Sequence, residues 1–313
     1  MAQTPGDKIF TPFPKDFGMP FYYDAVSFMW NYFSVPIDRV LPHLEGTGLT
    51  PARFTDLESD DHIIVSLNFQ NYLSNLGMVL TTVLEVEFNI HCYPTSRENE
   101  TPLISFREYM MGQEQTKWIG GFRLHVPADD AIAVQAGTEV FGERKFKTGF
   151  TFNVPVANNP TPPAGQEWPW VYTVFDPSVD VKKDPDSPDF IYRLWANMDH
   201  LGRPTMTNPS PLTLYSLLPG GADHPPGYGT LDVSRWNILG FDKTWFDTDK
   251  TCWEDSNGQE QPIVKVEVGE SKHLMATDTK TIIGDTPACA VRYYQSPPAA
   301  VENRAFWADG PKE

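Results

Sequence analysis

The stretch GTEVFGERKFK at residues 137–147 carries four charged side chains within five positions, namely Glu143, Arg144, Lys145 and Lys147. A lysine acts as a nucleophile only when its amine is neutral, and both removal from water and a neighbouring positive charge lower its pKa. Lys145 has Arg144 beside it, Lys147 two residues on, and apolar neighbours at Phe141, Phe146 and Phe150. A neutral amine there would condense with a ketone to give a protonated Schiff base, an electron sink for C–C cleavage. The alternative is a solvated charged hairpin in which Glu143 pairs with a nearby cation.

Two glutamates lie in an otherwise apolar segment, VLEVEFNI at 83–90. Glu85 and Glu87 are two residues apart, so a β-strand places both on one face. A buried carboxylate costs several kcal/mol unless it is paired, so an inward face would need a cation such as Lys145. In the alternative interpretation this face is the solvent side, and Val86 and Phe88 point inward.

Two arginines, Arg107 in SFREYMM and Arg123 in GGFRLHV, are candidates for binding a substrate carboxylate, because a guanidinium binds carboxylates in a bidentate way. The alternative for each is an ordinary surface arginine, which is the commoner environment of this residue type. The seven histidines are dispersed and the three cysteines have no CxxC spacing, so the sequence predicts no metal site and no cofactor.

The composition favours a mainly β protein. Phe, Tyr and Trp make up 13% of the chain, and 29 prolines point to loops between short elements. The net charge of −17 argues against nucleic acid and against an anionic membrane surface as partners. No stretch approaches the roughly 18 apolar residues of a membrane span, and the expected location is the cytosol.

The chain is expected to form one domain, 1–313, with an extended N-terminal arm at 1–24 and a loop-rich insertion at about 154–240. The hydrophobic patterns predict these elements: strands at 25–33, 62–72, 78–93, 104–111 and 116–127, and short helices at 36–42 and 128–136. In the second helix, Asp129 and Asp130 suit the first turn.

The first half of the chain resembles the acetoacetate decarboxylase superfamily. FSVPIDRVLPHLEG at 33–46 is similar to the family's early landmark, and IAVQAGTEVFGERKFK at 132–147 to its Gly-Arg-Glu and Pro-Lys motif. Gly137 and Glu139 match the family's Gly and Glu, and Lys145 falls on the Schiff-base lysine. Arg144 replaces the motif's proline, and Phe146 stands where the decarboxylases have a second lysine that depresses the nucleophile's pKa.

The resemblance implies an antiparallel β-barrel or cone with a few flanking helices, and an oligomer is typical of the family. It also implies a cofactor-independent lyase that forms a Schiff base on Lys145 with a keto acid. The size of the loop-rich second half points to a substrate larger than acetoacetate, of the kind found in secondary metabolism. Glu85 or Glu87 would transfer protons. The residues expected to bind substrate are Arg107, Arg123, Glu139, Arg144 and Phe146.

Decarboxylation is the default reaction. The missing second lysine leaves aldol, retro-aldol and dehydration chemistry open. The rival interpretation is a non-catalytic β-barrel that binds an apolar or aromatic small molecule, with Lys145 serving as a carboxylate partner.

Overall fold

The computed structural model describes residues 21–75, 80–153, 170–197, 210–216, 232–238, 241–245, 252–255, 257–295, 299–301 and 306–307. The predicted arm therefore lies mostly outside the described residues, and so does much of the predicted insertion at 154–240. Residues 21–24 do not belong to an arm, because strand β1 begins at Phe21. Whether the chain forms one domain stays a prediction.

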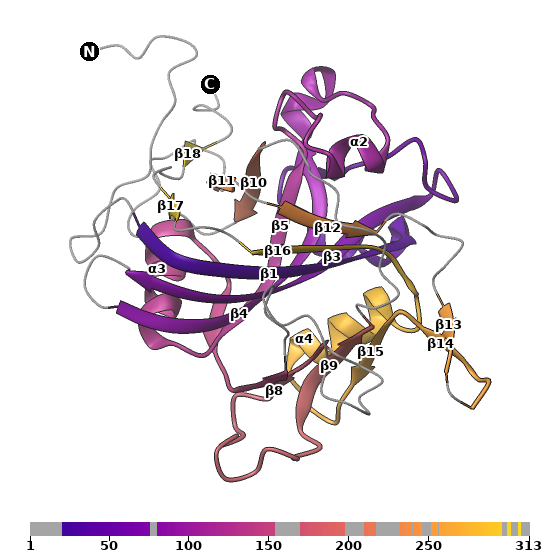
Figure 1. The fold of residues 1–313 in the computed structure, drawn as a ribbon. Helices are drawn as coiled ribbons and strands as arrows, with labels where there is room; N and C mark the ends of the chain where they lie inside the picture. The colour runs from indigo at the N-terminus through magenta and orange to yellow at the C-terminus, as the bar shows by residue number, and fades with distance from the viewer. Residues whose placement is uncertain are drawn as a thin grey trace, which may run out of the picture.

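Three long antiparallel strands form the centre of the main sheet, and they are β1 (Phe21–Pro36), β3 (His62–Asn75) and β4 (Leu80–Pro94). The sequence predicted all three. Strands β1 and β3 run longer than predicted, and β4 is described from Leu80 to Pro94, against a predicted strand at 78–93. Figure 1 shows them as the curved indigo and violet strands across the middle of the molecule. The register sets Trp30 of β1 opposite Asn68 of β3, and Asn68 opposite Glu87 of β4.

Strand β5 (Gly120–Ala128) continues the sheet beyond β4, and its pairing makes the sheet mixed rather than antiparallel. It is antiparallel to β4 but parallel to both β6 (Lys145–Lys147) and β10 (Ser210–Ser216). The other strands of this sheet are β2 (Leu49–Pro51), β11 (Asp232–Ile238), β12 (Phe241–Trp245), β16 (Ala288–Gln295), β17 (Ala299–Val301) and β18 (Phe306–Trp307).

The strand path of the main sheet runs β12-β16-β1-β3-β4-β5-β10-β11-β18. Among the described residues its two ends do not pair with each other, so the closed barrel is not confirmed. The fold class is a sheet-rich α+β fold.

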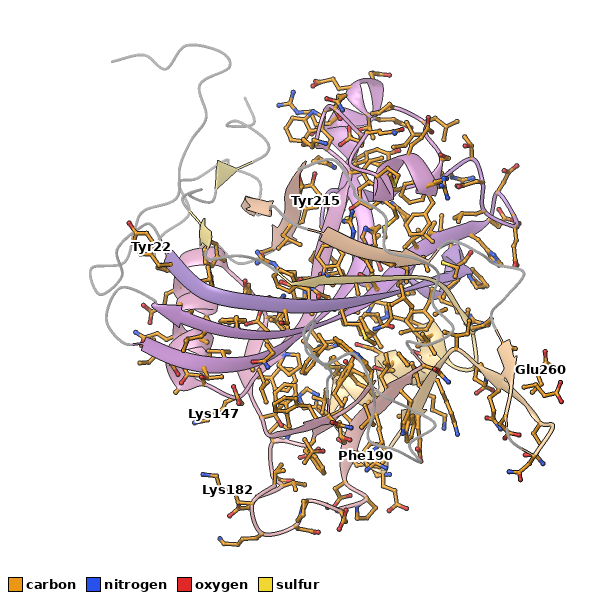
Figure 2. The ribbon with its side chains drawn as sticks, in the orientation of Figure 1. Tyr22, Lys147, Lys182, Phe190, Tyr215 and Glu260 are labelled. Carbon is orange, nitrogen blue, oxygen red and sulfur yellow. The ribbon has the colours of Figure 1, made fainter. Side chains whose placement is uncertain are left out.

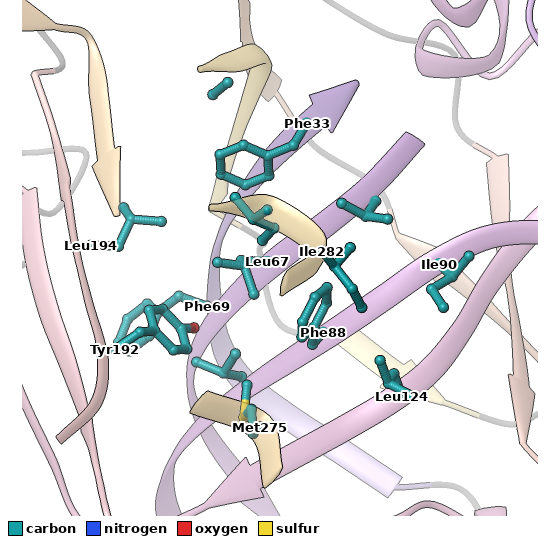
Figure 3. Packing of buried hydrophobic residues seen from close by; sticks show 14 of the residues in the cluster. Phe33, Leu67, Phe69, Phe88, Ile90, Leu124, Tyr192, Leu194, Met275 and Ile282 are labelled. Carbon is teal, nitrogen blue, oxygen red and sulfur yellow. The ribbon is translucent and has the colours of Figure 1, made fainter. Parts of the chain in front are cut away.

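A second, antiparallel sheet packs on one face of the first. Its strands are β7 (Phe150–Asn153), β8 (Trp170–Phe175), β9 (Phe190–Ala196) and β15 (Val264–Val268). Figure 3 shows Phe69 and Phe88 of the main sheet close to Tyr192 of β9 and Met275 of helix α4. This apolar layer fixes the face of β3 and β4 opposite to the one that carries Glu85. A separate hairpin joins β13 (Cys252–Glu254) and β14 (Glu260–Pro262).

The described helices are short, and they are α1 (Leu41–Leu44), α2 (Phe106–Met110), α3 (Ala131–Phe141) and α4 (Leu274–Asp278). Turns of 3-10 helix span Ile37–Arg39 and Thr95–Glu100, and a π-helical turn spans Thr279–Ile283. None of the helices in the described ranges has the length and apolar character needed to cross a membrane.

The predicted strand at 104–111 is wrong, because this segment forms α2. The Ser105 side chain accepts from the Glu108 backbone N–H, and the Glu108 carboxylate accepts from the Ser105 backbone N–H. This reciprocal capping box satisfies two backbone donors and starts a helix.

Candidate active site

Lys145 is placed by the turn that joins α3 to β6. Helix α3 starts at its N-cap Asp130, whose carboxylate accepts from the backbone N–H groups of Ile132 and Ala133. It ends at Gly142, which has a left-handed φ of 62° that glycine adopts without strain. The chain then enters β6 in parallel register with β5, with Lys145 opposite Val126. The lysine is therefore fixed between a helix end and the main sheet.

The Lys145 amine is buried against two carboxylates. Its Nζ lies 2.6 Å from Glu85 Oε2 and 3.2 Å from Glu143 Oε2, and its side chain is 5% exposed. The Tyr72 hydroxyl also donates to Glu85 Oε2, at 2.6 Å. The prediction of a solvated charged hairpin is therefore wrong for Lys145, because its amine forms ion pairs with carboxylates inside the protein.

Strand β4 is buried on both faces around Glu85 and Glu87. The alternative in which the two glutamates face solvent is therefore wrong. Glu85 and Glu87 are 3% and 2% exposed, and Val86 and Phe88 on the opposite face are fully buried. Glu87 Oε2 accepts from the side-chain amides of Asn68 and Asn89, each at 3.2 Å. The structure thus brings Glu85 to Lys145 and gives Glu87 a different set of partners.

Arg123 reaches the same cluster from β5. Its guanidinium donates to Glu143 Oε1, to the Phe141 backbone carbonyl at 3.2 Å and to the Ser216 hydroxyl. Arg123 is 1% exposed. It is therefore not a surface arginine, and its carboxylate partner within the fold is Glu143.

The electrostatics of Lys145 differ from the expectation that neighbouring cations lower its pKa. Burial lowers the pKa of Lys145, but the carboxylates of Glu143 and Glu85 raise it by more, so the pKa lies above its usual value. Lys147 is exposed, and Figure 2 shows it at the edge of the molecule. The expected depression of the Lys145 pKa by Arg144 or Lys147 is therefore wrong.

The pKa values of Glu85 and Glu143 are shifted in opposite directions. Burial raises the pKa of Glu85 to about 7, with Lys145 opposing the rise and Glu143 and Glu87 adding to it. Burial also raises the pKa of Glu143, but Lys145 and Arg123 lower it further, so it lies below its usual value. Glu143 is thus the permanent anion, and Glu85 is the group able to exchange a proton near neutral pH.

A glycine in α3 allows this cluster to form. A Cβ on Gly137 would lie 2.3 Å from Glu143 Oε2 and 2.4 Å from Lys145 Cδ, which is closer than atoms approach. The close approach of Glu143 and Lys145 therefore requires a glycine at this position, which is the one that matches the family motif.

A small pocket of about 20 Å³ lies beside the lysine. Its lining combines the three charged groups with aromatic and small residues: Phe21, Tyr23, Tyr72, Glu85, Ala133, Ala136, Gly137, Phe141, Glu143 and Lys145. This arrangement sets an amine and an adjacent proton acceptor on the wall of one pocket, which is the pairing that Schiff-base chemistry requires.

Four of the predicted residues do not reach the Lys145 cluster. Arg107 is exposed on α2, and Glu139 accepts from Gln135 along α3. Arg144 is exposed, with its guanidinium 5.7 Å from the Phe122 ring centre. Phe146 stacks on the His273 ring, 4.4 Å between ring centres. Alternation along β6 explains the last, since Phe146 points away from the face of Lys145, and Arg144 immediately precedes that strand.

Sequence reasoning missed Tyr72 and gave Glu143 only the role of a surface partner. Glu143 lies two residues before Lys145, and the period-two alternation of the strand predicts that the two share a face. Tyr72 carries no local signal, because its contact with Glu85 depends on the register between β3 and β4.

The fold is that of the acetoacetate decarboxylase-like enzymes. An acetoacetate decarboxylase from Legionella pneumophila superposes with a TM-score of 0.53 at 11% identity, covering 93% of this chain and 88% of that one. The enduracididine biosynthesis enzyme MppR, complexed with the condensation product of pyruvate and imidazole 4-carboxaldehyde, gives 0.54 at 11% identity, covering 92% and 89%.

An acetoacetate decarboxylase-like enzyme from Sphingomonas wittichii RW1 is also similar, with a TM-score of 0.51 at 10% identity and 92% coverage of both chains. No protein-family model matches the sequence, and no curated protein does. At these identities the likeness concerns the fold.

Proposed function

We propose that this protein is a cofactor-independent lyase that forms a Schiff base between Lys145 and a keto acid. The observation that carries the proposal is the buried contact of Lys145 Nζ with Glu85 Oε2 at 2.6 Å, on the wall of a pocket. The similar fold of MppR, whose structures hold pyruvate and a pyruvate condensation product, supports a keto acid as the substrate.

The first step requires a neutral amine. Glu85, as the carboxylate, takes a proton from the Lys145 ammonium, and the amine then attacks the substrate carbonyl carbon. The carbinolamine loses its oxygen as water, and the product is a protonated Schiff base. Glu143 lies 3.2 Å from the same nitrogen and stabilises its positive charge.

The second step moves an electron pair into the Schiff base. When the bond to the carboxylate of a β-keto acid breaks, CO₂ leaves and its bonding pair forms an enamine, which takes up at carbon a proton that Glu85 relays from solvent. Water then hydrolyses the Schiff base and frees Lys145. When Glu85 instead removes an α-proton from the Schiff base, the resulting enamine attacks an aldehyde. Hydrolysis of that Schiff base releases an aldol adduct, and loss of water from the adduct gives the dehydrated product.

Decarboxylation remains the default reaction, and one observation favours the aldol alternative. Phe146 stands where a second lysine is expected, and its ring contacts His273 on the other face of β6. Because residue 146 is a phenylalanine, it cannot lower the pKa of Lys145 as the second lysine does in the motif of the decarboxylases. Measuring CO₂ release from acetoacetate, and condensation of pyruvate with an aldehyde, separates the two reactions.

The test of Schiff-base chemistry is trapping with sodium borohydride in the presence of pyruvate or acetoacetate. We expect a reduced adduct on Lys145 by mass spectrometry, and none in Lys145→Arg, which keeps the positive charge. No adduct with either keto acid in the folded wild-type protein would overturn the proposal.

The same experiment decides the second candidate, a non-catalytic protein that binds an apolar or aromatic molecule. The aromatic lining of Phe21, Tyr23 and Phe141 favours that candidate. Binding of an aromatic keto acid without any trapped adduct would establish it.

A further inference from the structure

Tyr72 reaches the Lys145 cluster from β3, the strand next to the one that carries Glu85. The register sets Tyr72 opposite Val83 of β4. Glu85 lies two residues further along β4 and on the same face, so it is the diagonal neighbour of Tyr72. Diagonal positions on paired strands lie about 7–8 Å apart, which an aromatic side chain can span. The Tyr72 hydroxyl therefore meets Glu85 Oε2, at 2.6 Å.

The phenol ring of Tyr72 is held in place within the protein. Tyr72 is 6% exposed, and its ring packs edge-on against the Tyr23 ring, with 5.4 Å between ring centres. Both tyrosines line the pocket at Lys145. Burial, followed by the nearby Glu85 carboxylate, holds the pKa of Tyr72 well above its usual value, so the hydroxyl keeps its proton at neutral pH. Tyr72 is therefore a fixed hydrogen-bond donor.

Two different donors meet one oxygen of Glu85. The Tyr72 hydroxyl and Lys145 Nζ each lie 2.6 Å from Oε2. The lysine must give its proton away before it can react, whereas the phenol keeps its own. A hydrogen bond to the ionised form of a carboxyl group favours that form. Tyr72 thus stabilises the carboxylate that is needed as the acceptor for the Lys145 proton.

The titratable and charged side chains around this carboxylate come from every strand packed beside it. They are Tyr23 on β1, Tyr72 on β3, Glu87 on β4, Arg123 on β5, Glu143 before β6 and Lys145 on β6. Burial raises the pKa of Glu85 most, Lys145 lowers it, and Glu143 and Glu87 raise it, while Arg123 donates to Glu143. Within the described residues, Tyr72 is the uncharged hydrogen-bond donor to Glu85, so removing its hydroxyl changes no charge.

We propose that Tyr72 is a positioning residue for Schiff-base formation, and that its hydroxyl keeps Glu85 ionised and directed at the Lys145 amine. This role rests on the proposed function for the chemical step, whereas the effect of Tyr72 on the charge of Glu85 belongs to the resting protein. Without the phenol, the buried carboxyl group would hold its proton up to a higher pH. Fewer molecules near neutral pH would then offer the acceptor for the Lys145 proton.

The test is Tyr72→Phe, which removes the hydroxyl and keeps the ring, and it has two readouts. NMR of isotope-labelled glutamate gives the pH midpoint of the Glu85 carboxyl group in the protein alone, with Glu85→Gln to identify its signal. Time-resolved borohydride trapping on Lys145 gives the pH profile of the rate with pyruvate. We expect both midpoints to rise by about one pH unit, the lower range for losing a hydrogen bond to a charged group.

The shape of the rate profile separates this role from a structural one. Because only the ionised fraction of Glu85 changes, the rate in Tyr72→Phe should fall about tenfold at about pH 6 and by less than about twofold above about pH 9. A loss of packing alone would lower the rate by the same factor at every pH and leave both midpoints unchanged.

The matched control is Tyr192→Phe. Tyr192 is also fully buried, and its hydroxyl donates to the Tyr172 hydroxyl at 3.2 Å, but it lies on β9 of the second sheet. This variant loses the same atom from a buried tyrosine, so both midpoints should stay at the wild-type values.

A second substitution keeps the test decisive if Tyr72→Phe does not fold. A ring-fluorinated tyrosine incorporated at position 72 retains the hydroxyl and makes it a more acidic and stronger donor. Both midpoints should then move down, in the direction opposite to that of Tyr72→Phe.

The two readouts distinguish failure of this role from failure of the lyase. Unchanged midpoints in both position-72 variants overturn the role of Tyr72, even if the wild type forms the adduct. A shifted NMR midpoint in a protein that forms no adduct with either keto acid overturns the proposed lyase and keeps the effect of Tyr72 on Glu85.

Discussion

At the residue scale, the central feature is an ammonium group held by a carboxylate whose pKa is near neutral. The pKa of Glu85 is raised by burial to about 7, whereas that of Lys145 is raised above its usual value by Glu143 and Glu85, which outweigh the effect of burial. Lys145 therefore rests as an ammonium group. It becomes a nucleophile by giving a proton to Glu85, rather than through a neighbouring cation.

The first prediction is a pH dependence set by Glu85. Below pH 7 the folded protein holds Glu85 protonated, and above it the carboxylate can accept the Lys145 proton. The rate of adduct formation with pyruvate should therefore rise with pH through about 7. Glu85→Gln should lose this rise and slow the rate by about 100-fold, the lower range for general-base catalysis.

The comparison variant for this prediction is Glu87→Gln, which changes the neighbouring carboxylate but leaves Glu85 in contact with Lys145. It should keep a rise near neutral pH. An unchanged pH profile in Glu85→Gln, or loss of the rise only in Glu87→Gln, would assign proton transfer to Glu87.

The second prediction concerns the space that Gly137 leaves. In Gly137→Ala, the new methyl group would overlap Glu143 Oε2 and Lys145 Cδ, so both side chains must move. We expect adduct formation to fall at least about tenfold, because misplacing a reacting group by 1 Å costs up to 100-fold. The control is Gln135→Ala on the exposed side of α3, which should react as the wild type does. A wild-type rate in Gly137→Ala would show that the lysine position tolerates the shift.

At the element scale, local signals account for what the sequence predicted and for what it missed. The alternation in β3 and β4 and the acidic start of α3 were sufficient to predict these elements. Ser105 and Glu108 form a capping box within a segment that also alternates like a strand, and this cap makes the segment a helix. The position of Phe146 follows from alternation in β6 once Lys145 is known to point inward.

The third prediction tests α3 as the support of the site. Asp130 accepts from the backbone N–H groups of Ile132 and Ala133 at 2.8 and 2.9 Å, and Ala133 lines the pocket. Asp130→Ala should lower the free energy of unfolding by about 1 kcal/mol, the usual effect of losing an N-cap. Urea unfolding measures the change, with Gln135→Ala as the control on the same helix. Equal stability of Asp130→Ala and the wild type would contradict a capping role.

At the scale of the whole molecule, the pairing of distant segments could not be predicted from the sequence. The parallel contacts of β5 with β6 and β10, and the packing of β8 and β9 beneath the main sheet, join residues far apart in the chain. No local pattern selects such partners. The contact of Tyr72 with Glu85 also depends on long-range register. The family resemblance could therefore identify Lys145 but not the residues that contact it.

The fourth prediction follows from the charge of the chain. The net charge of −17 repels an anionic keto acid at long range, and salt screens this repulsion over a Debye length of about 10 Å at 0.1 M. The second-order rate of adduct formation with pyruvate should therefore increase about threefold between roughly 10 and 200 mM NaCl. Acetone is the control, because it offers the same carbonyl without a charge and its rate should not change. A pyruvate rate that falls with salt would mean that local cations around the pocket attract the substrate more strongly than the net charge repels it.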